Sequence, residues 1–266
     1  MCSFDISLIM RRMTEIKRNK NDYYDANIFS LPNAITQYED NDHAIAFSVK
    51  DRDIIRIYFA ANDSEQLTSI LTKFPVHSGI EIISKTINRE TEEAIRKSGF
   101  IKENVYLRGM NNNLRELLYK NIPEKYQNVD VTQYAQPATP EDADDIYEYI
   151  HDVFDPLMDH LQTREEVLCD INNGTYLIHR DDGYLTTICK YVIQGKRVYM
   201  EYAANRGERI NMHSLYLAGL EDAVKKGINV AYNWVREDNA RSLAFCKRFG
   251  IVPDGTSNYI FIKRDL

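Results

Sequence analysis

The residues best suited to acid–base chemistry lie near the end of a predicted strand, RVYMEYAA, in the second half of the chain. Glu201 is the candidate general base, because a carboxylate there could deprotonate an ammonium directly or through water. Strand alternation places Glu201 on the same face as Tyr199 and Ala203. Tyr202 lies on the opposite face and is the alternative candidate, as a hydroxyl donor. If the first face does not line a site, Glu201 is an edge-strand charge.

The residues that follow this strand could bind a phosphate group. The connection to the next helix is longer than its counterpart in the first half, and the extra residues are Arg206-Gly207-Glu208-Arg209-Ile210. Such a loop presents backbone N–H groups at the positive end of a helix. The two arginines would add charge-assisted hydrogen bonds. In the alternative interpretation, Asn211 caps its own helix and both arginines are solvated.

The sequence does not indicate a metal site. The segment from His151 to His160 holds two histidines and three aspartates, but their spacing repeats no fixed ligand motif. We interpret these residues as polar groups around a helix end. The four cysteines lie far apart and form neither a zinc motif nor a disulfide framework, which is typical of reduced thiols in a cytoplasm. They are Cys2, Cys169, Cys189 and Cys246.

Hydrophobic periodicity predicts the elements that position these residues. The second half should begin with a helix capped by Thr139, with Pro140 at its first position. A second helix over 163–171, a three-stranded meander ending at RVYMEYAA and a long helix over about 211–226 follow. The first half should hold a helix near its start, a hairpin over 44–61, and alternating helices and strands to about 119.

The two halves repeat each other. Tyr58-Phe59-Ala60-Ala61-Asn62 matches Glu201-Tyr202-Ala203-Ala204-Asn205, each at the end of a strand. Two further matches follow in the same order downstream, which predicts a duplicated β-β-α-β-α-β unit. A stretch rich in Pro, Gln, Asn and Asp separates the halves. We therefore predict an α/β fold with two domains, 1–125 and 126–266, each a mixed, mainly antiparallel sheet flanked by helices.

The run from Asn239 to Ile251, NARSLAFCKRFGI, resembles the Asn…Tyr…Gly-Phe helix of the general N-acetyltransferase (GNAT) superfamily. The resemblance covers roughly 130–266, and the first half looks like a degenerate unit of a tandem member. It implies acetyl-CoA as co-substrate, held between splayed central strands. The residues implied to contact it are Ala203, Ala204, Arg206, Gly207, Glu208, Arg209, Ile210, Asn211, Met212, Asn239 and Ser242.

The chain departs from the family pattern at three positions. Arg209 and Asn211 occupy the small-residue positions of the loop, where glycines let the backbone approach the pyrophosphate. Cys246 falls where many members carry a tyrosine that protonates the departing CoA thiolate. A thiol is a plausible acid for this step. Alternatively, Cys246 is a small buried core residue.

The resemblance implies transfer of an acetyl group to a primary amine of a small molecule or peptide, by direct attack on the thioester. Asp155 and Asp159 border the acceptor side in such a unit and could attract a cationic amine. A different class of function is also open: a non-catalytic GNAT-like module that has lost its cofactor loop and serves in binding.

Composition limits the partners. The 33 basic and 40 acidic residues give a net charge of −7, which disfavours a nucleic-acid partner. We also expect no membrane partner, because no apolar run approaches about 20 residues. The predicted last strand, NYIFIK, could pair between subunits as an exposed edge, so a homodimer is a prediction.

Overall fold

The computed structural model describes residues 6–18, 24–25, 35–52, 54–120, 122, 124, 130 and 133–265. The chain forms two compact units. The first unit comprises Met1–Tyr106, Pro156–His160 and Thr256–Leu266, and the second comprises Leu107–Asp155 and Leu161–Gly255. This division differs from a single cut at 125/126, a point that lies outside the described residues. The second unit already begins at Leu107, and the first unit includes Pro156–His160 and Thr256–Leu266.

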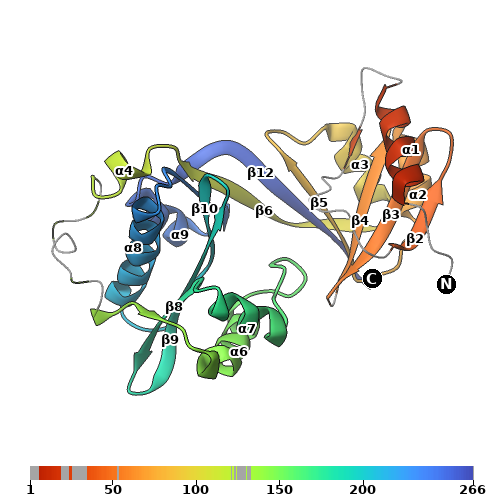
Figure 1. The fold of residues 1–266 in the computed structure, drawn as a ribbon. Helices are drawn as coiled ribbons and strands as arrows, with labels where there is room; N and C mark the ends of the chain where they lie inside the picture. Colours follow the sequence, from red (N-terminus) through yellow and green to blue (C-terminus); the bar gives the residue numbers. More distant parts are fainter. Residues whose placement is uncertain are drawn as a thin grey trace. The chain divides into compact units, whose positions relative to one another are not determined.

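The first unit is a mixed sheet with helices on both faces. Strands β2, β3 and β4 are antiparallel, and β5 is parallel to β4. Helix α1 covers one face, whereas α2 and α3 cover the other (Figure 1). The elements are α1 (Ile6–Arg18), β1 (Tyr24–Asp25), β2 (Ile35–Asp40), β3 (Ala44–Asp51), β4 (Ile54–Ala61), α2 (Ser64–Leu71), β5 (Ser78–Ser84) and α3 (Arg89–Lys97).

Local sequence explains where these helices begin and end. The Asp63 carboxylate accepts from the amides of Glu65 and Gln66 and so caps α2. Asn88 caps α3 in the same way. Gly99, with φ +91°, follows α3 in the left-handed region that glycine adopts at little cost.

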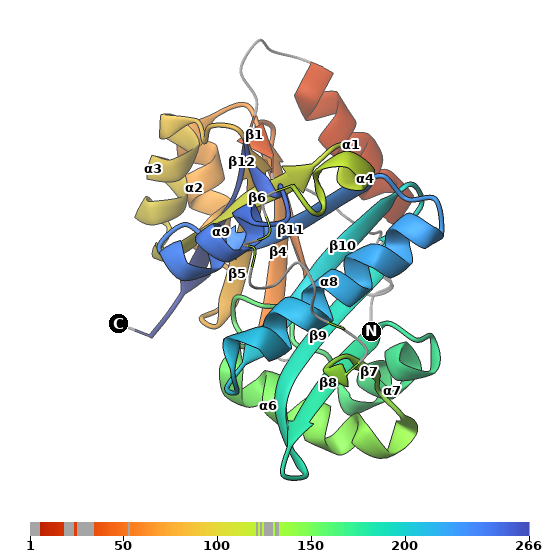
Figure 2. The same ribbon diagram turned by 90° about the vertical axis from the view of Figure 1, so that its left-hand side faces the viewer.

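The second unit repeats this plan. Its sheet order is β11-β10-β9-β8-β7, with α6 and α7 on one face and α8 and α9 on the other. Helix α8 runs along β9 and β10 in both ribbon views (Figures 1 and 2). The elements are α4 (Leu114–Leu117), β7 (Gln136–Pro137), the 3-10 turn η2 (Pro140–Asp142), α6 (Ala143–Val153), α7 (Arg164–Asn172), β8 (Tyr176–Asp181), β9 (Tyr184–Gln194), β10 (Arg197–Asn205), α8 (Arg209–Lys225), β11 (Val230–Arg236) and α9 (Ala240–Lys247).

The predicted duplication is confirmed. β3-β4-α2-β5-α3-β6 and β9-β10-α8-β11-α9-β12 follow the same order, where β6 is Phe100–Asn111 and β12 is Val252–Lys263. Each repeat begins with an antiparallel pair and adds a parallel strand after its first helix. The predicted fold class, two units with mixed, mainly antiparallel sheets flanked by helices, is therefore also confirmed.

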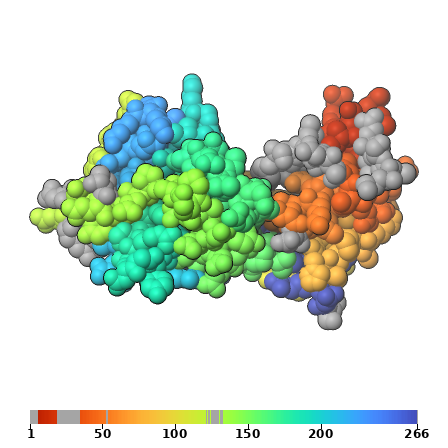
Figure 3. Space-filling view, turned by 60° about the horizontal axis from the view of Figure 1, so that its bottom comes forward, coloured from red at the N-terminus to blue at the C-terminus, as the bar shows by residue number. Residues whose placement is uncertain are grey.

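The last strands of the two repeats are exchanged. Residues Ser257–Lys263 of β12 pair antiparallel with β5 in the first unit, and Leu107–Asn111 of β6 belong to the second unit. In Figure 3 the dark blue residues near the C-terminus accordingly lie among the orange and yellow residues of the first unit. The strand NYIFIK is therefore interior rather than an exposed edge, so the basis for pairing between subunits is wrong. A homodimer stays a prediction.

Candidate active site

The candidate site is built where β10 separates from β11. The parallel pairing joins Arg197–Tyr199 to Val230–Tyr232, and no further pair between these strands occurs among the described residues. Immediately beyond, the pairing of β10 with β9 shifts between Met200 and Ala203, which marks a bulge. From Met200 onward, β10 thus has an edge along which β11 does not continue. An extended ligand could form backbone hydrogen bonds there.

The bulge changes which side chains share a face. Met200 packs in the core beneath α8, whereas Tyr202 packs against α6, with its ring 5.2 Å from that of Phe154. The predicted alternation, which put Met200 and Tyr202 on one face, is therefore wrong. Glu201 and Tyr202 instead share a neighbour, because the Lys190 ammonium contacts the Glu201 carboxylate and lies 5.5 Å from the centre of the Tyr202 ring.

Glu201 belongs to a charged network around Lys190. The buried Lys190 Nζ lies 2.6 Å from Glu201 Oε2 and 2.7 Å from Asp170 Oδ2. Gln162 extends the network, because its amide donates to Asp170 at 2.7 Å and its Oε1 accepts from the Tyr176 hydroxyl at 2.6 Å. A general base at Glu201 would therefore work beside a fixed ammonium. The sequence alternation around KYVIQ gave no signal that Lys190 points inward.

The loop before α8 is organised by Asn205. Its Oδ1 accepts from the Gly207 amide at 3.0 Å, and its Nδ2 donates to the Glu208 carbonyl at 3.0 Å. Helix α8 then starts with Glu208 as its N-cap, without a side-chain cap bond. Asn211 lies inside the first turn, buried, and its amide lies 3.3 Å from Asp181 Oδ2. Asn211 is therefore not the helix cap, and the interpretation that it caps α8 is wrong.

The two loop arginines differ in what they contact. The Arg206 guanidinium pairs with Asp152 and lies 4.6 Å from the centre of the Tyr149 ring. Arg209 is exposed at the first position of α8. Asp181 adds a negative charge beside the loop, and a hydrogen bond from Thr186 lowers the pKa of its carboxyl. Any phosphate at this helix end would thus rely on Arg209 and the first-turn amides more than on Arg206.

Helix α9 begins as predicted and carries Cys246 into the core. The Asn239 side chain accepts from the Ser242 amide at 3.0 Å. Cys246 Sγ accepts from Asn233 Nδ2 at 2.9 Å and lies 4.0 Å from the Tyr216 hydroxyl of α8. Burial raises the pKa of the Cys246 thiol to about 11. The sulfur is thus a buried hydrogen-bond acceptor. Both interpretations of Cys246, as the acid that protonates the CoA thiolate and as a small core residue, therefore stay open.

Asp155 and Asp159 fall in different units. Asp155 belongs to the second unit, whereas Asp159 belongs to the first, where its Oδ1 accepts from the Tyr106 hydroxyl at 2.6 Å. Within the described part of the chain, no cluster of three or more His, Cys, Asp or Glu side chains has the arrangement of a metal site. No described helix is long and apolar enough to cross a membrane.

The remaining candidate residues surround the loop. Ala203 and Ala204 follow the bulge on β10, exposed and buried respectively, and Met212 is buried in the first turn of α8. Gly207 is closely surrounded, because a Cβ there would lie 2.8 Å from Asp181 Oδ2 and 2.9 Å from Asn211 Nδ2. The side chains of Asp181 and Asn211 therefore fill the space next to Gly207.

Comparison with solved structures identifies the fold. The chain superposes on a GCN5-related N-acetyltransferase from Sphaerobacter thermophilus with a TM-score of 0.56 and 12% identity, covering 84% of this chain and 78% of that one. A putative acetyltransferase of the GNAT family from Novosphingobium aromaticivorans gives 0.53 at 11% identity, covering 83% and 89%. A conserved protein of unknown function from Staphylococcus epidermidis gives 0.54 at 14% identity, covering 94% and 98%.

No protein-family model matches the sequence, and no curated protein matches it. The identities to these three solved structures lie between 11% and 14%, so the likeness is one of fold. The chain has the GNAT fold, in two units, as the sequence resemblance predicted.

Proposed function

We propose that the second unit is an acyl-CoA-dependent N-acetyltransferase that transfers an acetyl group from acetyl-CoA to a primary amine of a small molecule or peptide. The observation that carries this proposal is the separation of β10 from β11 after Tyr199, followed by the bulge and the loop that starts α8. This arrangement provides a free strand edge next to a helix N-terminus. Acetyl-CoA would supply an activated acetyl thioester there.

The residues of the chain would contribute mainly by positioning. Backbone N–H groups of Tyr202–Ala204 on the free edge would polarise the acyl carbonyl. Arg209 and the first-turn amides of α8 would hold the pyrophosphate. The acceptor nitrogen would attack the carbonyl carbon as the C–S bond breaks. Glu201, Tyr202 and Cys246 are the groups we propose for proton transfer.

Among the side chains near the site, Glu201, directly or through a water beside it, is the best candidate to accept the amine's proton. Its carboxylate is held on the α6 and α7 side of β10 by Lys190. Lys190 would also repel a protonated amine, so the acceptor is expected to bind as the free base or to lose its proton early. Tyr202 and Cys246 are candidates for the proton that the thiolate takes up.

A second function is favoured by specific side chains. Three features would hinder the binding of a pyrophosphate. Arg206 is already paired with Asp152, and the Asp181 carboxylate lies beside Gly207. Arg209 and Asn211 also place side chains where the family pattern has small residues. These features support a non-catalytic module with the same fold. The two functions make opposite predictions about cofactor binding.

Isothermal titration of the full chain with acetyl-CoA and with free CoA, at low and moderate salt, tests the proposal. We expect micromolar affinity that weakens with salt, because arginine contacts to phosphate are screened. Release of free thiol during incubation with acetyl-CoA and a panel of primary amines then identifies the acceptor class. Absence of binding in a folded sample would favour the non-catalytic module.

A further inference from the structure

The five residues between α6 and α7 that join the first unit, Pro156–His160, contact it through each of the last four. The Leu157 carbonyl accepts from Arg56 Nη1 at 3.4 Å, and Asp159 accepts from Tyr106. Met158, which is buried, packs with Ile54 of β4 and with two isoleucines of β12, Ile260 and Ile262. We call Pro156–His160 the anchored segment.

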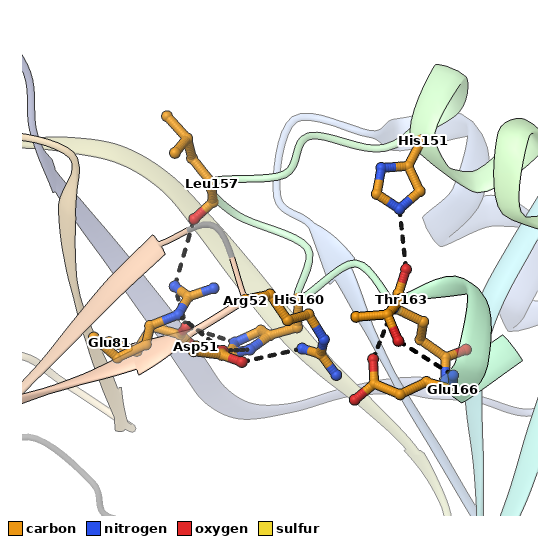
Figure 4. Close-up of polar contacts among 10 residues, drawn as sticks. Asp51, Arg52, Glu81, His151, Leu157, His160, Thr163 and Glu166 are labelled. Atoms are coloured by element: carbon orange, nitrogen blue, oxygen red, sulfur yellow. Dashed lines mark hydrogen bonds and ion pairs between the residues drawn. The ribbon is translucent and has the colours of Figure 1, made fainter. Parts of the chain in front are cut away.

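His160 makes the most specific of these contacts (Figure 4). Its Nδ1 lies 3.0 Å from Asp51 Oδ2 and its Nε2 lies 2.6 Å from Glu81 Oε1. The Glu81 carboxylate is fixed in turn by Arg56, at 2.7 Å, and by Asn258, at 2.8 Å. Both ring nitrogens of His160 are thus held by carboxylates from two different strands of the first unit.

The backbone conformation of His160 depends on its side-chain contacts. Its φ of +48° is in the left-handed region, which costs a non-glycine residue free energy. The two carboxylate contacts offset that cost only while the imidazole lies between Asp51 and Glu81. The conformation is therefore held by the side chain, and loss of the side-chain contacts should release the backbone.

On both sides of the anchored segment, the chain reaches the candidate site in the second unit. Phe154, two residues before it, packs on Tyr202, and Asp152 pairs with Arg206 of the loop. Gln162, two residues after it, donates to Asp170, which shares Lys190 with Glu201. The residues of the anchored segment are thus separated along the chain by only a few residues from those that contact the site.

Hydrogen bonds at the start of α7 restrain the chain that follows the anchored segment. His151 Nε2 lies 3.0 Å from the Gln162 carbonyl. Thr163 and Glu166 then form a reciprocal capping box at the first turn of α7 (Figure 4). Movement of the anchored segment would therefore be transmitted to Gln162 rather than absorbed in a loose loop.

We propose that the degenerate first unit positions the acceptor side of the site by holding the anchored segment, and that His160 is the positioning residue. The proposal rests on the proposed acyl transfer. It gives the first unit a function although that unit lacks the loop insertion of the second. His160 touches neither acyl donor nor acceptor in this role and acts through Phe154 and Gln162.

The charges around His160 give the contact a pH dependence. It faces Asp51 of β3 and Glu81 of β5, with the cations Arg52 and Arg56 nearby. Burial alone would lower the pKa of His160, but the two hydrogen bonds outweigh it and raise the pKa to about 9. A raised pKa means that the stabilising contribution is complete below the unfolded value of about 6.5 and is lost as pH rises through about 9.

Hydrogen–deuterium exchange of the full chain tests the proposal. The variant His160→Asn keeps a residue that tolerates the left-handed backbone but cannot bridge both carboxylates. We expect exchange to rise at least about fivefold over residues 152–162. The matched control is His77→Gln in the same unit, which also changes a histidine of positive φ, in an exposed ion pair with Asp265. The control should leave residues 152–162 unchanged.

A pH series and kinetics separate positioning from a purely structural role. Between pH 7 and 10, corrected exchange of residues 152–162 should rise in the wild-type chain and stay flat in His160→Asn. The KM for the amine should rise about tenfold in that variant, with the affinity for acetyl-CoA unchanged. Unchanged exchange, or unchanged amine KM despite faster exchange, would overturn the proposal.

A second variant keeps the test decisive if His160→Asn unfolds. Asp51→Asn removes one of the two carboxylate charges and retains the shape of the side chain. We expect an intermediate rise in exchange over the same residues. Failure of the proposed function shows separately, as absence of acetyl-CoA binding in the wild-type chain, a measurement that does not involve the anchored segment.

Discussion

At the residue scale, Cys246 shows how burial limits thiol chemistry. Its sulfur is enclosed between α8, α9 and β11, and burial raises its pKa to about 11, so little thiolate is present near neutral pH. Burial likewise raises the pKa of Cys189. We expect iodoacetamide at pH 8 to alkylate the exposed Cys169 well before either residue, as measured by peptide mass spectrometry. Rapid alkylation of Cys246 in the folded chain would instead indicate an accessible, activated thiol.

The two loop arginines should differ in their effect on cofactor binding. Arg209 is exposed at the start of α8, whereas Arg206 is already paired with Asp152. Arg209→Ala should therefore weaken acetyl-CoA binding about tenfold, the effect of one charge-assisted hydrogen bond, and Arg206→Ala less than about threefold. Titration calorimetry measures both. Lys226→Ala, which removes a charge at the opposite end of α8, is the control, and the reverse order of effects would contradict the assignment.

At the element scale, the sheet depends on a buried ammonium between β9, β10 and α7. Replacing Lys190 by methionine would leave the Glu201 and Asp170 carboxylates facing each other without their counter-charge. Removing one partner of a buried ion pair typically costs about 3–5 kcal/mol, so we expect a loss of about 3 kcal/mol in the free energy of unfolding. Urea denaturation measures it.

The matched control for this change is Lys226→Met. Lys226 pairs with Asp222 on the surface of α8, where ion pairs contribute little, so the expected loss is below about 0.5 kcal/mol. Equal losses in the two variants would mean that Lys190 is not the counter-charge of the network. A loss confined to Lys190→Met would support Glu201 as a fixed carboxylate of the site.

Element boundaries could be predicted from the sequence, but the geometry of β10 could not. The caps at Asn88, Thr163 and Asn239 follow from side chains that bond to amides two or three residues ahead. The bulge after Met200 carries no such local signal, because alanines and a tyrosine fit a regular strand equally well. One extra residue then reversed the faces on which the prediction for Tyr202 depended.

At the scale of the whole molecule, the exchange of the last strands could not be predicted from the sequence, for a related reason. The alternating pattern of NYIFIK predicts a strand but does not identify the strand beside it, since β5 and β11 hold equivalent places in the two repeats. The anchored segment was likewise attributed to a helix end, because His160 and its partners Asp51 and Glu81 are about 80 to 110 residues apart. Long-range pairing of this kind depends on the tertiary fold.

The exchange makes the first unit dependent on the C-terminal strand. Phe261 of β12 is fully buried in the core beneath α2 and α3, and β12 covers the edge of β5. A fragment of residues 1–125 should therefore lack a cooperative thermal transition, since an uncovered β5 edge and an incomplete core remain. Adding a peptide of residues 252–265 should restore the transition, as followed by circular dichroism.

The peptide also supplies its own control. The same peptide with Phe261→Ala should bind far more weakly, because truncating a buried phenylalanine costs about 3–5 kcal/mol, a factor of a hundred or more in affinity. A fragment that melts cooperatively alone would contradict the dependence. So would a peptide whose effect does not depend on Phe261. Restoration by the wild-type peptide alone would establish that the first unit is completed by the last strand of the second repeat.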